Sequence, residues 1–231
     1  MPRQSRNQKP YIIVFCEGES EQMYTDFLKQ KFKDYAVITR PKSTGLFEDA
    51  DKKFKRDSRY RENIEVTDEV WFFFDVEAED IPKWEERLKI IKRLRKLRKN
   101  PNIKVRLLMT TGCIEYWLLL HYRYVTPIIR TPADKDKVEA QLKGIEPLYK
   151  KGDRSSTLKI ALNYQTAREN AKKTVSNLIQ DGLPDLFDTD ERNQWLCKHC
   201  KTFSTVYEAI DFLTELRNKE SIDKPQGVKN Y

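Results

Sequence analysis

The chain lacks any long uninterrupted apolar segment. No apolar run approaches the roughly 20 residues that a helix needs to cross a bilayer, so we expect no membrane span. No signal peptide is visible at the N-terminus, and we therefore expect a cytoplasmic protein. The four cysteines are scattered along the chain, and in that compartment we expect their thiols to be reduced.

Two familiar motifs for phosphate and metal are also missing. The segment Lys42-Ser43-Thr44-Gly45 has neither the preceding glycine nor the residue order of a P-loop, so we interpret it as a turn. The segment Cys197-Lys198-His199-Cys200 supplies one CxxC motif, and no second pair of ligands lies at a suitable spacing. Zinc binding by Cys197 and Cys200 therefore stays an open question.

Positive charge exceeds negative charge. Lysine and arginine number 44 against 36 aspartate and glutamate residues, which gives a formal net charge of +8. This excess suits a polyanionic partner such as nucleic acid, although many proteins carry a similar excess without one. The basic runs could follow a phosphate backbone or form solvated faces, and both interpretations stay open. Our candidate nucleic-acid contacts are Lys42, Lys92, Arg95, Lys96, Lys99 and Lys151.

The first half of the chain alternates between apolar runs and helical patterns. The apolar runs at 11–16, 36–40, 69–75 and 103–109 are typical of buried strands. Ser20 is a suitable cap for the first helix, and Pro82 suits the start of another. This alternation predicts an α/β fold, in which helices cover both faces of a parallel sheet. The remaining helices of this half are expected over 46–61 and 113–122.

After Tyr124 the character of the sequence changes. Helices are predicted over 131–143, 155–180 and 205–218, and no further strong strand is visible. We therefore expect two parts: an α/β domain over residues 1–125 and a helical C-terminal region over 126–231 packed on it.

Acidic residues follow two of the predicted strands. Glu17 comes directly after the first strand, Asp75 ends the strand at 69–75, and Glu77 and Asp80 follow that strand. Because parallel strands end at the same edge of a sheet, these carboxylates are expected to lie together. Carboxylates held close together repel one another and are costly to desolvate, so they suit a hard divalent cation, Mg²⁺ or Mn²⁺. The alternative is that they only end strands on a solvated rim.

Three other residues are candidates for supporting this site. Glu21 lies in the first turn of a helix, where an acid also interacts favourably with the helix dipole. Glu115 follows the last predicted strand. It is either a further acid of the site or a buried partner for a lysine or arginine. His121 lies on an apolar helix, where a histidine satisfied within the core is the alternative.

These segments resemble a known family. Residues 15–18 and 75–77 resemble the two acidic motifs of the Toprim domain, a metal-binding module of topoisomerases, primases and some nucleases. Residues 17–21 and the segment CIEYWLLLHY at 113–122 are similar to the RloB/AbiLii family, Toprim-like bacterial proteins found near restriction and phage-defence genes. The resemblance covers most of the chain and implies a Toprim/Rossmann-like fold with a Mg²⁺ site.

The resemblance also implies an activity. It points to a Mg²⁺-dependent nuclease that hydrolyses or nicks phosphodiester bonds, with Glu17, Asp75 and Glu77 as catalytic residues and nucleic acid as partner. In the family, the residue matching Glu17 can act as general acid or base. A role in phage defence or abortive infection, with a protein partner from the same operon, belongs to this expectation.

One departure from the family pattern affects the expected activity. Glu77 stands where the Toprim motif has aspartate, and its extra methylene displaces the carboxylate from the octahedral geometry that Mg²⁺ prefers. A second hypothesis is therefore a catalytically silent subunit that binds nucleic acid or a partner protein. A third is phosphoryl chemistry on a small nucleotide.

Overall fold

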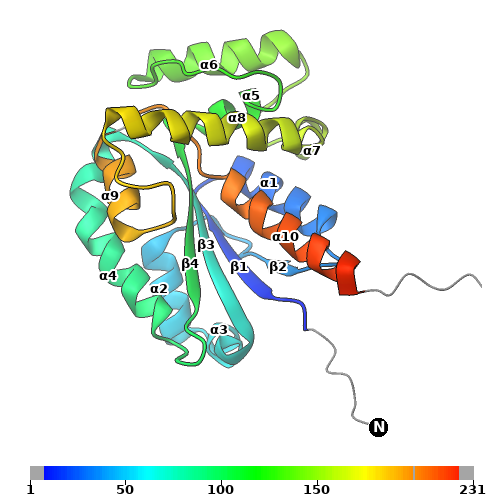
Figure 1. Cartoon of the computed structure of the whole chain (residues 1–231), viewed down its shortest axis with the longest axis vertical. Coiled ribbons are helices and arrows are strands. Elements are labelled where there is room, and N and C mark those ends of the chain that lie inside the picture. The colour runs from blue at the N-terminus through cyan, green and yellow to red at the C-terminus, as the bar shows by residue number, and fades with distance from the viewer. Residues whose placement is uncertain (1–7, 200, 224–231) are drawn as a thin grey trace, which may run out of the picture.

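The computed structural model describes residues 8–199 and 201–223 and contains a sheet of four parallel strands (Figure 1). Their order is β2 (Val37–Thr39), β1 (Tyr11–Cys16), β3 (Thr67–Val76) and β4 (Lys104–Thr111). All neighbouring strands pair in parallel. The prediction of an α/β fold with a parallel sheet is confirmed.

Helices alternate with the strands as far as β4, and in the described residues after β4 the named elements are all helices. In the described ranges, no helix is both long and apolar enough to span a bilayer. The helices are α1 (Glu19–Lys31), α2 (Phe47–Arg56), α3 (Ser58–Glu62), α4 (Trp84–Arg95), α5 (Ile114–Leu119), α6 (Pro132–Ile145), α7 (Arg154–Ala161), α8 (Tyr164–Asn177), α9 (Asp190–His199) and α10 (Tyr207–Asp223), with short 3-10 turns η1 (Ile64–Val66), η2 (Ala78–Lys83) and η3 (Leu178–Asp181).

The aromatic run in β3 explains why both faces of the sheet are covered. Successive side chains of a strand point to opposite faces. Phe72 stacks on Phe47 of α2 with ring centroids 4.1 Å apart, whereas Phe73 meets the edge of Tyr24 of α1 at 6.1 Å. Asp75 is two residues beyond Phe73, so it belongs to the same face as α1 and ends up at the carboxyl edge of the sheet.

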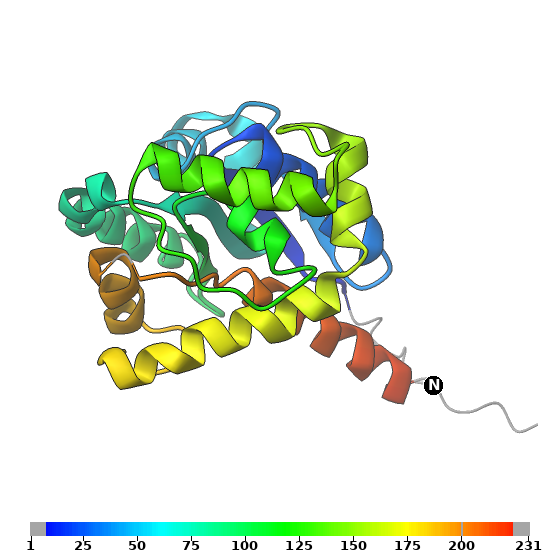
Figure 2. The ribbon, with the colours of Figure 1, turned by 90° about the horizontal axis from the view of Figure 1, so that it is seen from above.

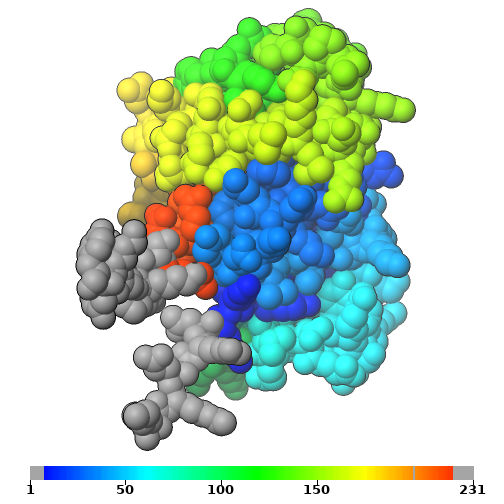
Figure 3. Space-filling view, turned by 90° about the vertical axis from the view of Figure 1, so that its right-hand side faces the viewer, coloured from blue at the N-terminus to red at the C-terminus, as the bar shows by residue number. Residues whose placement is uncertain are grey.

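Figure 1 shows how the layers are arranged. Helices α2 and α4 lie on one face of the sheet, and α1 and α10 lie on the other. Helices α5, α6 and α8 lie above the carboxyl ends of the strands, where Figure 2 shows α6 and α8 from above. Figure 3 shows α1 in the middle of one side of the molecule with the green-to-yellow region of helices α6 to α8 above it, and α7 packs on α1. The predicted boundary at residue 125 stays a prediction.

A C-terminal segment closes the outer edge of β4. The backbone N–H of Thr205 donates to the carbonyl of Met109 at 2.8 Å, and that of Thr111 donates to Phe203 at 3.1 Å. Covering an edge strand removes a surface that could pair with another chain. The C-terminal part is therefore bonded directly to the sheet.

Several local predictions differ from the structure. Helix α1 begins at Glu19 with Gly18 as its N-cap, so the prediction that Ser20 caps it is wrong. The Ser20 hydroxyl instead accepts from the N–H of Gly152 at 3.0 Å. Pro82 lies inside η2, and α4 begins only at Trp84. Helix α9 was not expected, and the helices expected over 46–61 and 155–180 are each divided in two.

Candidate metal centre

Four carboxyl groups from four different elements gather at the carboxyl edge of the sheet, and we call them the acid cluster. Glu17 follows β1 and Asp75 ends β3 on the neighbouring strand. The backbone N–H of Asp75 donates to Glu17 Oε2 at 2.8 Å, which fixes these two residues side by side. The first turns of α1 and α5 add Glu21 and Glu115.

Asp75 has the most unfavourable environment in the acid cluster. Burial and then the charges of Glu21, Glu17 and Glu115 raise its pKa well above the usual range. Its Oδ1 atom is fully enclosed and has no hydrogen-bond partner among the described residues. A buried carboxylate oxygen without a partner carries the full cost of desolvation. This oxygen is therefore the strongest structural indication of a site for a positively charged ligand.

The neighbouring carboxyl groups are perturbed in the same direction. Burial and then the charges of Glu17 and Glu115 raise the pKa of Glu21 to about 7. Burial also raises the pKa of Glu17, although the hydrogen bond from Asp75 opposes the change. Glu17 is exposed, whereas Glu21 and Glu115 keep only 4% and 1% of their surface accessible. The cluster is thus deep but open to solvent at Glu17.

Lys151, from the loop between α6 and α7, brings positive charge to the acid cluster. Its Nζ lies 3.6 Å from Glu115 Oε1, and Tyr149 in the same loop donates to that oxygen at 2.9 Å. Burial lowers the pKa of Lys151, but the charges of Glu115, Asp75 and Glu21 raise it by more than burial lowers it. The net change is therefore a rise. Within the described ranges, the contact of Lys151 with Glu115 is the only ion pair that the four carboxyls make, so negative groups outnumber positive groups in direct contact at the cluster.

The structure places Glu77 and Asp80 beside the acid cluster, each with a cation of its own. Glu77 Oε1 accepts from Lys135 of α6 at 2.5 Å. Asp80 accepts from Arg87 at 2.7 Å and from the N–H of Glu77 at 3.1 Å, which closes the turn at the start of η2. Asp80 thus shapes the loop, whereas Glu77 is held by a single lysine that could exchange partners.

His121 lies inside the core rather than at the acid cluster. Its Nε2 is 3.1 Å from the hydroxyl of Tyr24, and its Nδ1 is 3.0 Å from the carbonyl of Trp117. Burial lowers its pKa to about 4, so the ring is neutral at physiological pH. Both nitrogens are used within the fold, which leaves His121 a supporting role in packing.

Four of the other basic candidates, those at the end of α4 and just after it, lie away from the acids. Helix α4 starts near the carboxyl end of β3 and runs antiparallel to the strand, so its last turn reaches the opposite edge of the sheet. Lys99 bridges to Asn102 just before β4, and Arg95 pairs with Asp190 at 2.9 Å. This arrangement separates the acid cluster from Lys92, Arg95, Lys96 and Lys99. Lys42 is exposed, and its carbonyl accepts from Gln22 at 3.3 Å.

Two residues of the site were missed by the sequence analysis. Lys135 and Tyr149 meet Glu77 and Glu115 only because α6 packs against α5 and its following loop returns to α1. Neither residue belongs to a local motif in the sequence. Only information on which distant positions contact each other could have identified them.

The donor set of the acid cluster fits a hard cation by its chemistry. Within the described residues, no three Asp, Glu, His or Cys side chains are already arranged to hold a metal ion. Carboxylate oxygens are nevertheless the ligands that Mg²⁺ prefers, and the unpartnered oxygen of Asp75 lies among them. Zinc binding at the CxxC motif stays untested, because Cys200 lies outside the described residues and Cys197 is buried in α9.

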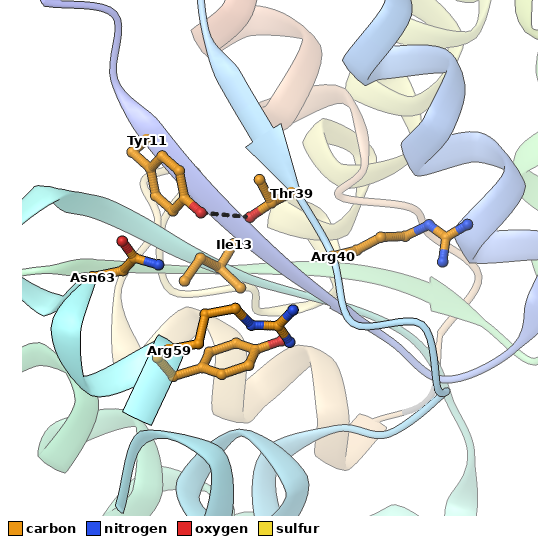
Figure 4. A pocket seen from close by; sticks show the side chains of 7 residues that line it. Tyr11, Ile13, Thr39, Arg40, Arg59 and Asn63 are labelled. Carbon is orange, nitrogen blue, oxygen red and sulfur yellow. Dashed lines mark hydrogen bonds between the residues drawn. The ribbon is translucent and has the colours of Figure 1, made fainter. Parts of the chain in front are cut away.

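A separate small pocket lies toward the amino end of β1. Its cavity volume is about 140 Å³, and Tyr11, Thr39 and Arg40 are among the residues that line it (Figure 4). Thr39 Oγ1 donates to the Tyr11 hydroxyl at 3.4 Å, and Arg40 points away toward its ion pair with Asp26. Of the two arginines that line this pocket, Arg40 is paired with Asp26 and Arg59 lies over the ring of Tyr60, so the pocket is a weaker candidate site than the acid cluster.

Comparisons with known proteins agree with the resemblance seen in the sequence. A search of curated proteins found no match. The family model described as RloB-like protein matches residues 12–213, a range that includes the acid cluster and all of the sheet except Tyr11. The chain therefore belongs to the RloB-like family.

Proposed function

We propose that this chain is a Toprim-like, Mg²⁺-dependent nuclease of a cytoplasmic restriction- or phage-defence-associated system. The observation that carries the proposal is the enclosed, unpartnered Oδ1 of Asp75 among carboxyls whose pKa values are raised. Membership of the RloB-like family supports the association with restriction or defence. Nucleic acid is the proposed substrate and a protein of the same system a proposed partner.

In this proposal the residues of the acid cluster divide the work. Glu17 and Asp75 bind the metal, and Glu21 completes the negative charge around it. A bound divalent cation would polarise the phosphodiester, activate water and stabilise the leaving oxygen. Lys151, which faces the cluster now, is positioned to contact a phosphate oxygen once the metal neutralises the carboxyls. Glu17 is exposed, so it can also exchange a proton with the solvent.

The test is a cleavage assay with labelled single- and double-stranded DNA and RNA, with and without Mg²⁺ or Mn²⁺. We expect metal-dependent products from the wild type and a loss of at least roughly 100-fold for Glu17→Gln and Asp75→Asn, as for other groups that stabilise a transition state. Glu62→Gln, which removes an exposed carboxylate of α3, should cleave normally. Equal cleavage by all four proteins would contradict the proposal.

The ion pair between Glu77 and Lys135 favours one alternative, a catalytically silent subunit. If Glu77 stays paired, the carboxylate from the second acidic motif is unavailable to a metal. The two hypotheses differ in one result: the silent subunit binds nucleic acid but produces no cleavage with any metal. Including mononucleotides among the substrates tests the third hypothesis, phosphoryl chemistry on a small nucleotide.

A further inference from the structure

A second pocket opens directly beside the acid cluster, and we call it the edge pocket. It begins at Val76 and Glu77 where β3 ends and has a cavity volume of about 370 Å³. Its apolar lining includes Val76, Ile81 and Ile129. Gly112 forms part of the wall with φ +76°, and a Cβ there would come within 2.3 Å of Ile129. The pocket is thus built by backbone that only glycine permits.

The edge pocket has a basic rim. Lys135 and Arg130 come from α6 and the residues before it, and Lys198 comes from the end of α9. In the described part of the chain, Arg130 and Lys198 make no ion pair, and both are exposed. The acids of the lining are Glu77, which is paired with Lys135, and Glu79. The rim therefore offers positive charge at Arg130 and Lys198 that no described carboxylate pairs with.

One aromatic side chain, His199, also lines the edge pocket. The ring of His199 stacks on Trp195 with centroids 4.2 Å apart and an interplanar angle of 18°. His199 Nδ1 is bonded to the carbonyl of Trp195 at 2.9 Å, which holds the imidazole in place. Flat side chains at the rim of an apolar pocket are the usual partners of unpaired bases.

Lys135 connects the edge pocket with the acid cluster. It bonds Glu77 in the pocket, and the charge of Asp75 also contributes to raising its pKa, against the effect of burial. Asp75 and Glu77 are two residues apart, roughly 7 Å at the spacing of a strand. A nucleotide seated in the pocket would therefore bring its phosphate to the acid cluster.

We propose that the edge pocket binds one unpaired nucleotide next to the scissile phosphate, so that the substrate is single-stranded nucleic acid. This inference rests on the proposed function, because it assigns the substrate of that site. The cavity has the size of a pocket for a single small ligand. A base can enter such a pocket only when it is not paired in a duplex. The apolar lining takes the base, and the basic rim takes the phosphates.

The test measures binding of labelled single-stranded and duplex oligonucleotides by fluorescence anisotropy, with Ca²⁺ in place of Mg²⁺ to slow cleavage. We expect single strands, DNA or RNA, to bind at least roughly tenfold more tightly than duplexes. Ile81→Glu places a charge on the apolar lining at a position that is 37% exposed, so folding is spared, and a thermal melt checks this. We expect it to weaken single-strand binding roughly tenfold, and Lys198→Gln to weaken it severalfold.

Two controls make the result specific. Lys104→Gln removes an exposed lysine at the start of β4, far from the pocket, and should bind like the wild type. An oligonucleotide with one base removed should bind the wild type more weakly but lose nothing further with Ile81→Glu. Duplex binding as tight as single-strand binding, or an unchanged affinity of Ile81→Glu, would overturn the edge pocket as a base site.

Cleavage measured in parallel separates this inference from the proposed function. Cleavage of blunt duplexes by the wild type and by Ile81→Glu at equal rates would leave the nuclease standing and refute the edge pocket. Pocket-dependent binding of single strands without cleavage by any metal would refute the nuclease and support the pocket.

Discussion

The substitution Glu21→Gln should stabilise the protein at alkaline pH and have little effect in acid. The carboxyl of Glu21 is buried, and its pKa is raised from 4.5 to about 7. At about 1.4 kcal/mol for each pH unit, that rise corresponds to roughly 3 kcal/mol of lost stability once the group is ionised in the folded protein. Glutamine has nearly the same shape and no charge, so it removes this cost.

The direction of this pH effect on folding stability follows from proton binding by the folded and unfolded states. Between pH 4.5 and about 7 the unfolded chain loses the Glu21 proton while the folded protein keeps it, so this group stabilises the fold less as the pH rises. His121 acts in the opposite direction, because its pKa falls from 6.5 to about 4 and the unfolded chain takes up its proton first as the pH falls. These two opposite effects on stability fall in overlapping pH ranges. The pH dependence of wild-type stability alone therefore cannot isolate the contribution of Glu21.

The assay is urea unfolding of the wild type and Glu21→Gln at pH 8 and pH 5, followed by tryptophan fluorescence. We expect the variant to be more stable by up to about 3 kcal/mol at pH 8 and by less than about 1 kcal/mol at pH 5. Mg²⁺ at ten times its dissociation constant should add about 1.4 kcal/mol to the wild type and less to the variant.

Glu19→Gln is the matched control for this experiment. It removes an exposed acid from the same first turn of α1, so both variants lose the same favourable interaction with the helix dipole. A gain in Glu21→Gln that is equal at both pH values, or a gain shared by Glu19→Gln, would refute the reasoning. So would a variant that is less stable than the wild type at pH 8.

Three further predictions concern the surroundings of the site. Gly112→Ala should lower the free energy of unfolding by roughly 1–3 kcal/mol, because its φ is +76° and the new Cβ would clash with Ile129; urea unfolding measures this, and an unchanged midpoint would contradict it. Asp80→Asn should cost about 3 kcal/mol by leaving Arg87 buried without its carboxylate, with metal affinity by titration calorimetry nearly unchanged; a large loss of affinity would instead make Asp80 a ligand. His121 should show no titration by NMR between pH 6 and 8, whereas a midpoint near its ordinary value would mean that the ring is not enclosed.

The sheet was predictable because its strands carry a strong local signal. The apolar run of β3 is too long and too aromatic to lie at the surface, and Asp75 follows it directly. The parallel pairing then requires Glu17 and Asp75 to meet at one edge. These two positions of the acid cluster depend only on local sequence and on topology.

The rest of the site depends on contacts between distant segments. Lys135, Tyr149 and Lys151 reach the acids because α6 and the following loop lie over the carboxyl edge, which no local pattern encodes. Ser20 has the residue type of a helix cap, but its hydroxyl is used by the N–H of Gly152 instead. The tertiary contact decides the role of this side chain, and local preference does not.

The sequence also could not show which acids already have partners. Glu77 and Asp80 resemble Asp75 in the sequence, since all three lie at or just beyond the end of the same strand. Only the fold shows that Lys135 and Arg87 neutralise the first two and that Asp75 is left without a partner for Oδ1. The difference between a ligand and a structural acid is therefore a property of the assembled chain.

The most direct test of the metal centre is a crystal soaked in Mn²⁺, with the anomalous signal used to locate the ion. We expect one strong peak at the acid cluster, with carboxylate oxygens of Glu17 and Asp75 within roughly 2.0–2.6 Å of the ion. Asp75 Oδ1, which lacks a partner now, should be one of the ligands. A fully soaked crystal with no peak at the acid cluster would contradict the proposed metal centre.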